Sequence, residues 1–259
     1  MKECEIFSDL RVPCGSKIVI RADGRNFSHL SSDLNLDKPY DLYFVNAMVD
    51  TCLEFFMEFS PRFIYTFSDE INIFLDEIPF GGRLEKLDSV FASFISGSFT
   101  CKIYHNQKFS EILEAQGDGD GEGTDSLKPV SFDSRVIPLD NEGLVTYFKG
   151  RQNDAWRNCL NGYAYWTLRQ KRGKEEVMKI LDEKKSSEIH EILFERGINV
   201  AEVPAWQRRG VGIYRKEVTV EGYNPVAKKH VESIRCKPFA DWELSIFSEE
   251  FFRLNHIMD

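Results

Sequence analysis

The chain has 259 residues, 42% of them hydrophobic, and a formal net charge of −9 at neutral pH. This length allows one well-buried domain plus a substantial appendage and leaves little room for two full domains. The first residues lack the features of a secretory signal, and no window approaches the roughly 20 apolar residues of a membrane span, so we expect a cytoplasmic protein without membrane contact.

The six cysteines are scattered along the chain and show no CxxC spacing. A zinc site is therefore not expected. In a reducing compartment such cysteines are usually small hydrophobic residues, and we predict that they are buried.

Positive charge is concentrated late in the sequence. Residues 205–239 carry a net charge of +5, whereas the rest of the chain sums to −14. Because salt limits the influence of each charge to about 8–10 Å, this segment can follow a phosphate backbone even on an acidic protein. A solvated, lysine-rich surface explains the same pattern equally well.

The first predicted elements are a strand, a helix and a hairpin. Residues 17–22 form a β-branched run that ends at Asp23-Gly24, which predicts a strand entering a turn. Apolar residues over 41–59 alternate spacings of three and four, the repeat of one buried helix face. Two strand-like runs within 62–75 flank Ser68-Asp69-Glu70 and predict a β-hairpin or tight bend with an acidic tip.

The middle of the chain predicts a helix, a strand and a loop. Residues 84–94 carry apolar side chains at helical spacing, and the run over 98–105 is strand-like. This alternation indicates an α/β or α+β class. Residues 116–126 are rich in Asp and Gly, contain almost nothing that a core could bury, and are predicted to form a mobile loop.

Helical patterns dominate the later part of the chain. Residues 143–172 predict a long helix with one apolar and one polar stripe. Two shorter helices are predicted over 174–183 and 187–196, and residues 211–220 are typical of an extended segment.

Carboxylates occupy the predicted strand end and the hairpin tip. Asp23 and the pair Asp69-Glu70 can therefore meet at one rim of a sheet. Mg²⁺ prefers oxygen ligands and keeps several waters, so one or two carboxylates, an accessible carbonyl such as that of Gly24, and substrate phosphates form a sufficient site. Two such ions, about 3.5–4 Å apart, would align an attacking oxygen with a phosphorus atom. Each piece alone is also ordinary turn chemistry.

Two groups of cations accompany these carboxylates. Arg83 and Lys86 share one face at the start of a predicted helix, where they could hold a triphosphate or could simply be surface cations. Near the C-terminus, aromatic residues alternate with cations, a pattern typical of RNA binding, although Trp206 is equally a candidate core residue. The cations that we predict to contact RNA are Arg208, Arg209, Arg215 and Lys216.

Seven segments, in this order, resemble the tRNA(His) guanylyltransferase family of 3′-to-5′ polymerases, over about residues 16–200. They are RADGRNF (21–27), LDKPYD (36–41), FSDEINIF (67–74), RLEKLDSVFASF (83–94), FDSRV (132–136), RQNDA (151–155) and EILFERGIN (191–199). The chain departs from the eukaryotic pattern at 155–159, at Ile189-His190 and at Ser28. It is thereby more similar to the archaeal and bacterial branch, whose members resemble templated 5′-end repair enzymes.

The resemblance implies a polymerase- or cyclase-like palm domain over 1–140, an antiparallel sheet flanked by helices. Residues 141–259 would form a helical region that completes the catalytic core and a basic, extended tRNA-binding segment. In this family ATP activates the 5′-phosphate of a tRNA, and the 3′-hydroxyl of an incoming nucleoside triphosphate then displaces AMP. The expected partners are tRNA, ATP, GTP or another nucleoside triphosphate, and copies of the same chain, as a homo-oligomer and candidate tetramer.

The resemblance also implies roles for individual residues. Asp23, the carbonyl of Gly24 and Asp69 correspond to ligands of two Mg²⁺ ions, with Glu70 as a supporting catalytic carboxylate. Nucleotide contacts are expected from Asp23, Gly24, Arg25, Asn26, Phe27, Ser28, Ser68 and Asp69, and phosphate contacts from Lys38, Arg83, Lys86 and Arg135. Fixed cations of this kind offset the roughly −4 charge of a triphosphate.

Two other functions stay open. A palm domain with two acidic strand positions also serves nucleotide cyclases, which would make a cyclic product without RNA. The chain could also be an inactive tRNA-binding protein that keeps the fold but not the reaction, with binding indifferent to magnesium and to Asp69→Ala.

Overall fold

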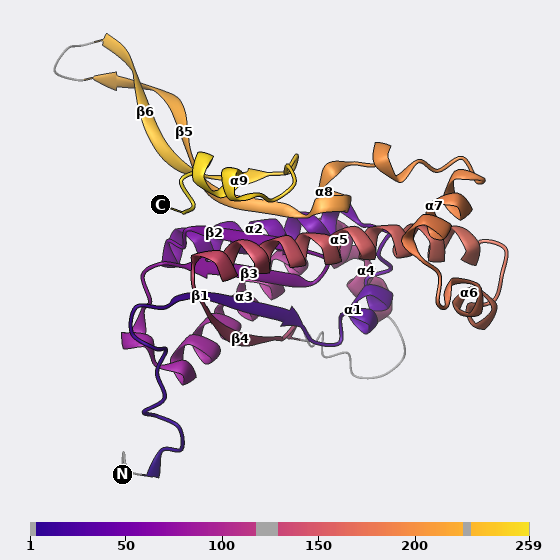
Figure 1. Cartoon of the computed structure of the whole chain (residues 1–259), viewed down its shortest axis with the longest axis horizontal. Helices are drawn as coiled ribbons and strands as arrows, with labels where there is room; N and C mark the ends of the chain where they lie inside the picture. The colour runs from indigo at the N-terminus through magenta and orange to yellow at the C-terminus, as the bar shows by residue number, and fades with distance from the viewer. Residues whose placement is uncertain (1–3, 118–128, 225–228, 259) are drawn as a thin grey trace.

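A computed structural model describes residues 4–117, 129–224 and 229–258 (Figure 1). Its strands are β1 (Lys17–Gly24), β2 (Phe63–Phe67), β3 (Glu70–Leu75), β4 (Phe132–Leu139), β5 (Val211–Asn224) and β6 (Lys229–Asp241). Its helices are α1 (Phe27–Asp33), α2 (Leu42–Phe59), α3 (Leu84–His105), α4 (Gln107–Gly117), α5 (Asn141–Arg169), α6 (Lys174–Leu181), α7 (Ser186–Phe194), α8 (Ala205–Arg209) and α9 (Glu249–Leu254), with short 3₁₀ turns at Phe80–Gly82 and Val200–Glu202.

The strands form one antiparallel sheet in the order β4-β1-β3-β2-β5-β6. The first four strands, with α2 and α3 between them, make the split β-α-β arrangement of two interleaved units. The predicted α+β sheet flanked by helices is thus confirmed. The central strands β1 and β3 are shielded by strands on both sides, so residues at their ends lie at the middle of the sheet rim.

Both faces of the sheet are covered, because successive side chains of a strand point to opposite faces. Ile18, Ile20 and Ala22 of β1 pack in a cluster with residues of α2 and α3. Val19, between them, packs in a second cluster with Phe148 of α5 and with α9. Figure 1 shows α5 along one face of the sheet, opposite α3. The long helix α5 therefore runs past the rim where the carboxylates lie.

The predicted strand over 98–105 is wrong, because α3 continues without a break to His105. Buried apolar residues recur every four positions beyond the predicted helix end, at Ile95, Phe99 and Ile103. This stripe extends the face begun by Leu87 and Phe91, and burial of a continuous helix face outweighs the strand preference of the β-branched and aromatic residues.

The structure bears on three other expectations, and that of buried cysteines is only partly met. Four of the six cysteines are exposed, and only Cys52 and Cys159 are buried as predicted. Of the predicted loop over 116–126, residues 118–126 lie outside the described residues, and Gln116 and Gly117 end α4. None of the helices in the described segments combines the length and apolar character needed to cross a membrane.

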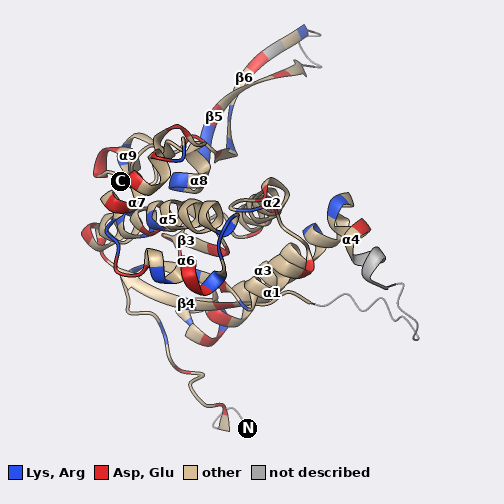
Figure 2. Ribbon diagram, turned by 90° about the vertical axis from the view of Figure 1, so that its right-hand side faces the viewer, with Lys and Arg blue, Asp and Glu red and all other residues tan. Residues whose placement is uncertain are grey.

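The strands β5 and β6 form a long two-stranded arm. Their pairing runs from Gly212 opposite Asp241 to Asn224 opposite Lys229, and the distal part extends away from the body (Figure 1). Lys and Arg occur along both strands and in α8, which lies beside the base of the arm (Figure 2). The predicted extended segment over 211–220 is confirmed and forms part of this arm.

Candidate active site

Antiparallel pairing brings the predicted carboxylates together. Asp23 of β1 lies opposite Glu70 of β3, and the amide of Gly24 donates to the carbonyl of Asp69 at 3.0 Å. Ser68 has a φ of +52°, so the two-residue connection between β2 and β3 turns tightly at this rim. Asp23 and Asp69 both line one open cavity of about 430 Å³. The convergence that the sequence suggested is therefore present in the fold.

Glu70 is the buried carboxylate of the site and is clamped by hydrogen bonds. Its Oε2 accepts from Arg151 of α5 at 2.8 Å, and its Oε1 accepts from Asn72 at 2.8 Å. The side-chain oxygen of Asn72, Oδ1, in turn accepts from the hydroxyl of Tyr147 at 2.6 Å. The Nε atom of Arg21 lies 3.6 Å from Oε2 of Glu70, the oxygen that also pairs with Arg151. This network ties the strand ends to α5, and Glu70 acts mainly as its anchor.

Burial changes the proton affinity of the site. It raises the pKa of Asp69 and of Glu70 above the ordinary carboxyl range, and in both cases the nearby charge of Asp23 adds to the shift. For Glu70 the hydrogen bond from Asn72 and the charges of Arg151 and Arg21 partly oppose it. Carboxylates that repel one another favour a bound cation, because a cation removes the repulsion.

The donor atoms of the site fit a hard cation. Asp23 and Asp69 offer carboxylate oxygens, and oxygen donors are what Mg²⁺ takes in proteins. No group of three or more His, Cys, Asp or Glu side chains in the described segments is arranged to hold a metal ion. Two carboxylates are nonetheless sufficient when a carbonyl, waters and substrate phosphates complete the shell. Asp23 is meanwhile paired with Arg21 at 2.9 Å and Arg135 at 3.3 Å.

The turn after β1 is held by close packing of Phe27 on Gly24. A Cβ atom at residue 24 would lie 2.3 Å from the Phe27 ring. The ring cannot retreat, since it is 8% exposed and packs on Phe99 and Phe132 at centroid distances of 5.5 and 5.1 Å. Glycine at residue 24 thus lets the nucleotide-contacting stretch predicted over 23–28 close tightly against the core.

We expect Gly24→Ala to destabilise the fold by about 1–3 kcal/mol, because the extra methyl overpacks this junction. Activity should fall with it, since the shift reaches Asp23. Gly97→Ala is the matched control: Gly97 is exposed in the interior of α3 with open space around it, so alanine should stabilise by about 0.5–1 kcal/mol. Denaturant unfolding of both variants checks the pair, and equal stabilities would contradict it.

The structure brings only one predicted phosphate-binding cation to the carboxylates. Arg135 of β4 pairs with Asp23 and with Asp133. Lys38 is exposed, donates to the hydroxyl of Ser31 and lies over the Trp166 ring. Within the described residues, Arg83 and Lys86 at the start of α3 form no ion pair with the carboxylates, and Arg83 lies 3.9 Å from Glu85.

The predicted RNA-binding cations divide into two kinds. Arg208 and Arg209 are half-buried and donate to the backbone carbonyls of Val203 and Leu244, both at 2.9 Å, so they stabilise the fold around α8. Arg215 and Lys216 are exposed at the base of the β5–β6 arm. Trp206 is half-buried and packs beside Tyr40 and Trp242. It is thus neither a fully buried core residue nor a fully exposed aromatic, which were the two predicted alternatives.

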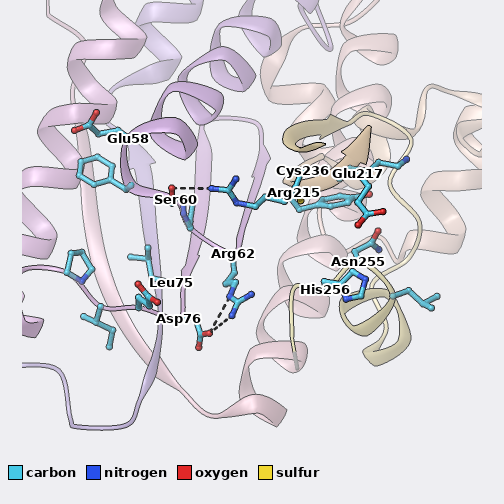
Figure 3. Close-up of a pocket in the computed structure, with 18 residues that line it drawn as sticks. Glu58, Ser60, Arg62, Leu75, Asp76, Arg215, Glu217, Cys236, Asn255 and His256 are labelled. Atoms are coloured by element: carbon cyan, nitrogen blue, oxygen red, sulfur yellow. Dashed lines mark hydrogen bonds and ion pairs between the residues drawn. The ribbon is translucent and has the colours of Figure 1, made fainter. Parts of the chain in front are cut away.

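Arg215 and Lys216 line a cavity of about 1070 Å³ at the far end of β2 and β3 from the carboxylates. Figure 3 shows Arg215 reaching toward Ser60 and Arg62 toward Asp76. Charges of both signs line this cavity and several are already paired. It is a mixed surface beside the arm, separate from the carboxylate site.

Sequence reasoning missed the side chains that hold the site in place. Arg21, Asn72, Tyr147 and Arg151 were not predicted to contact the carboxylates. Arg21, Asn72 and Arg151 do lie inside the quoted segments RADGRNF, FSDEINIF and RQNDA. The alternation of β1 was a usable signal for Arg21, since residues 21 and 23 share one face of the strand.

Carboxylates at the ends of two central antiparallel strands, with arginines beside them and an open polar cavity, define a class of protein: palm-type enzymes that act on nucleotide phosphates. Comparisons with known proteins agree. The family model described as tRNAHis guanylyltransferase matches residues 1–140, and that of the Thg1 C terminal domain matches residues 142–239. The chain belongs to the tRNA(His) guanylyltransferase family and is a nucleotidyltransferase.

The individual relatives described next are between 21% and 28% identical to this chain over the aligned residues. An uncharacterized protein of Acanthamoeba polyphaga mimivirus is 25% identical over 100% of this chain and 91% of its own length. The tRNA(His) guanylyltransferase 1 of Arabidopsis thaliana is 28% identical over 96% of this chain, which spans only 44% of that protein. A solved bacterial tRNA(His) guanylyltransferase-like protein in complex with ATP is 21% identical, with a TM-score of 0.70 over 99% of this chain and 96% of that one. This last likeness confirms the palm fold.

Proposed function

We propose that this enzyme activates the 5′ end of a tRNA with ATP and then joins a nucleoside triphosphate to it, with two Mg²⁺ ions held at Asp23 and Asp69. Nucleotidyl transfer to tRNA in the 3′-to-5′ direction is the activity of the family to which the chain belongs. The observation that carries the residue assignment is the convergence of these two carboxylates on one open cavity.

The metal site is assigned to the side chains of Asp23 and Asp69 and to the carbonyl of Gly24. Nucleotidyltransferases of this family are generally metal-dependent; the choice of Mg²⁺ and of two ions is part of the proposal. Bound there, the ions would neutralise phosphate charge and orient the attacking and leaving oxygens. Asp23 would release Arg21 and Arg135 as it takes up a cation, which frees both arginines to face phosphate oxygens.

The protein's own contribution is positioning and charge. Both proposed steps are phosphoryl transfers, in which little covalent chemistry falls to the protein. Arg135, beside Asp23, presents a planar fork that can hold a phosphate bidentately. The Glu70 network holds the strand ends in register, so the donors need no rearrangement during the reaction. Lys38, Arg83 and Lys86 remain proposed phosphate contacts. Because they are not paired with the carboxylates, a bound substrate would have to extend from the carboxylate cavity to reach them.

One assay separates this function from the two alternatives. The purified chain is incubated with labelled ATP, each nucleoside triphosphate in turn, and either 5′-monophosphorylated tRNA(His), a tRNA lacking its first nucleotide, or no RNA. We expect an adenylylated 5′ end followed by an added nucleotide. A cyclic product without RNA would indicate a cyclase, and tRNA binding without any product would indicate an inactive binding protein.

The same assay addresses the finer choices. Addition of guanosine to full-length tRNA(His) supports tRNA maturation, and templated addition to the shortened tRNA supports 5′-end repair. The proposal includes a cytoplasmic location and a homo-oligomer, with a tetramer as the candidate, which light scattering of the purified chain can measure.

For tRNA binding, Arg215 and Lys216 are the residues to test, because their side chains are exposed and Arg208 and Arg209 are tied to the fold. We expect the double variant Arg215→Gln, Lys216→Gln to bind tRNA more weakly and to reduce the slope of log affinity against log salt by about 1–2. The double change Lys174→Gln, Lys179→Gln on α6 removes equal charge from another exposed surface. Equal slopes for the two doubles, measured by filter binding, would count against the arm as a tRNA contact.

A further inference from the structure

A second cavity adjoins the carboxylate site and differs from it in chemistry. It measures about 240 Å³ and lies between α2, α5, α8 and the end of β2. The two cavities share Phe67, Ser68, Asn158 and Asn161 as lining residues, so they are neighbours along one groove. The first is lined by Asp and Arg side chains, whereas no charged side chain lines the second within the described residues.

The walls of this second cavity combine aromatic rings with amides. Tyr40, Phe67 and Trp206 supply the rings, with those of Tyr40 and Trp206 set edge to face at a centroid distance of 5.7 Å. Aromatic walls of this kind bind planar, apolar groups of a ligand best, because such groups can pack against the rings. The volume is below the roughly 300–1,000 Å³ of pockets that enclose a whole drug-sized ligand, so the cavity suits one ring system rather than a complete nucleotide.

Three amide side chains face this space with unused hydrogen-bonding capacity. Asn158 and Asn161 are three residues apart on α5, which puts them on one helix face. Neither side chain forms a hydrogen bond with another described residue, and both residues are exposed on α5. Gln207 accepts from the hydroxyl of Tyr163, which orients its amide and leaves the NH₂ group to donate elsewhere. Amides that both donate and accept can read the edge of a nucleobase.

We propose that this cavity is a nucleobase subsite, in which a base rests against the aromatic walls and its polar edge bonds to Asn158 and Asn161. The phosphates of the same nucleotide then lie at Asp23 and Asp69, one cavity away. This assignment rests on the function proposed above. The base could belong to a free nucleoside triphosphate or to the 5′-terminal nucleotide of the tRNA, because both present a base beside a reacting phosphate.

The test uses Asn158→Ala and Asn161→Ala, which remove polar groups from an exposed helix face and should leave folding intact. Asn46→Ala on α2 is the control, an exposed helical asparagine outside both cavities. Binding of ATP, GTP and tripolyphosphate is measured by calorimetry. If the base is that of a free nucleotide, either variant should weaken ATP or GTP binding about tenfold and leave tripolyphosphate binding unchanged.

The second arm measures the KM for tRNA in the adenylylation reaction. If the base belongs to the tRNA, the variants should raise this KM about tenfold for a tRNA with an intact 5′-terminal nucleotide and leave it unchanged for one whose 5′-terminal nucleotide lacks its base. Variants that match the wild type in both arms, or lose only kcat, overturn the subsite. A wild-type chain that adenylylates no tRNA refutes the proposed function instead, and the calorimetric arm still decides the subsite.

Discussion

Asp23→Asn and Asp69→Asn should each reduce nucleotidyl transfer at least about 10³-fold. An amide has the same shape as the carboxylate but lacks the negative charge that holds the cation. A bound cation stabilises the transition state by several kcal/mol, and this stabilisation would be lost. The fold should survive both changes. Asn at residue 69 keeps the shape of the side chain and removes a charge that burial already disfavours, as the raised pKa of Asp69 indicates.

The stability of the metal-free protein gives an independent readout of the same variant. Because the pKa of Asp69 is raised in the folded state, the folded chain binds this proton more tightly than the unfolded chain. The free energy of unfolding therefore falls as the pH rises from the ordinary carboxyl range through the folded pKa. Asp69→Asn lacks this loss, so at neutral pH, without metal, it should be at least as stable as the wild type.

Asp50→Asn provides the control, since Asp50 is exposed on α2 and lines neither cavity of the site. Single-turnover kinetics with preadenylylated tRNA measure the effect on the chemical step, and thermal unfolding measures stability. Wild-type rates in both Asp23→Asn and Asp69→Asn would remove the carboxylates from the mechanism. Added Mg²⁺ should raise the melting temperature of the wild type and of Asp50→Asn but not of the two site variants.

The sequence was sufficient to predict the carboxylate rim because that rim depends on local patterns. A β-branched run ending at Asp23 and two strand-like runs around Ser68-Asp69-Glu70 each predict an element within a few residues. Antiparallel pairing of β1 with β3 then places Asp23 opposite Glu70. The family resemblance supplied the one step that local patterns lack, namely that these two strands are neighbours.

Contacts across long sequence separations could not be predicted in the same way. Arg151 meets Glu70 only because α5 crosses the rim of the sheet, and the helical periodicity of α5 does not say which strand end it will pass. The cavity walls of Tyr40 and Trp206 come from two segments that fold together around α5. Phe99 was assigned to a strand because its aromatic and β-branched neighbours favour one, whereas packing of the whole α3 stripe decides for the helix.

Arg151 offers a test of whether the Glu70 network tunes the site or merely stabilises it. Arg151→Met removes the 2.8 Å ion pair with Glu70 and also an ion pair with Asp154, and it leaves Glu70 with Asn72 and Arg21. Breaking a buried pair typically costs about 3–5 kcal/mol, and the two remaining partners should reduce the loss in stability to about 2–3 kcal/mol. Arg253→Met, which breaks an exposed pair with Glu249, should cost no more than about 1 kcal/mol.

The decisive measurement is the pH profile of activity. Burial raises the pKa of Glu70, and the positive charge of Arg151 opposes that rise, so Arg151→Met should raise the pKa further. Protonation of Glu70 weakens its hold on Arg21, which also pairs with Asp23, so activity declines as the pH falls through this pKa. The acid limb of kcat/KM should therefore move to higher pH in Arg151→Met, move less in Arg151→Lys, and stay in place in Arg253→Met. An acid limb that stays fixed while stability falls would restrict Arg151 to a structural role, because the charge at residue 151 would then have no influence on the reacting carboxylates.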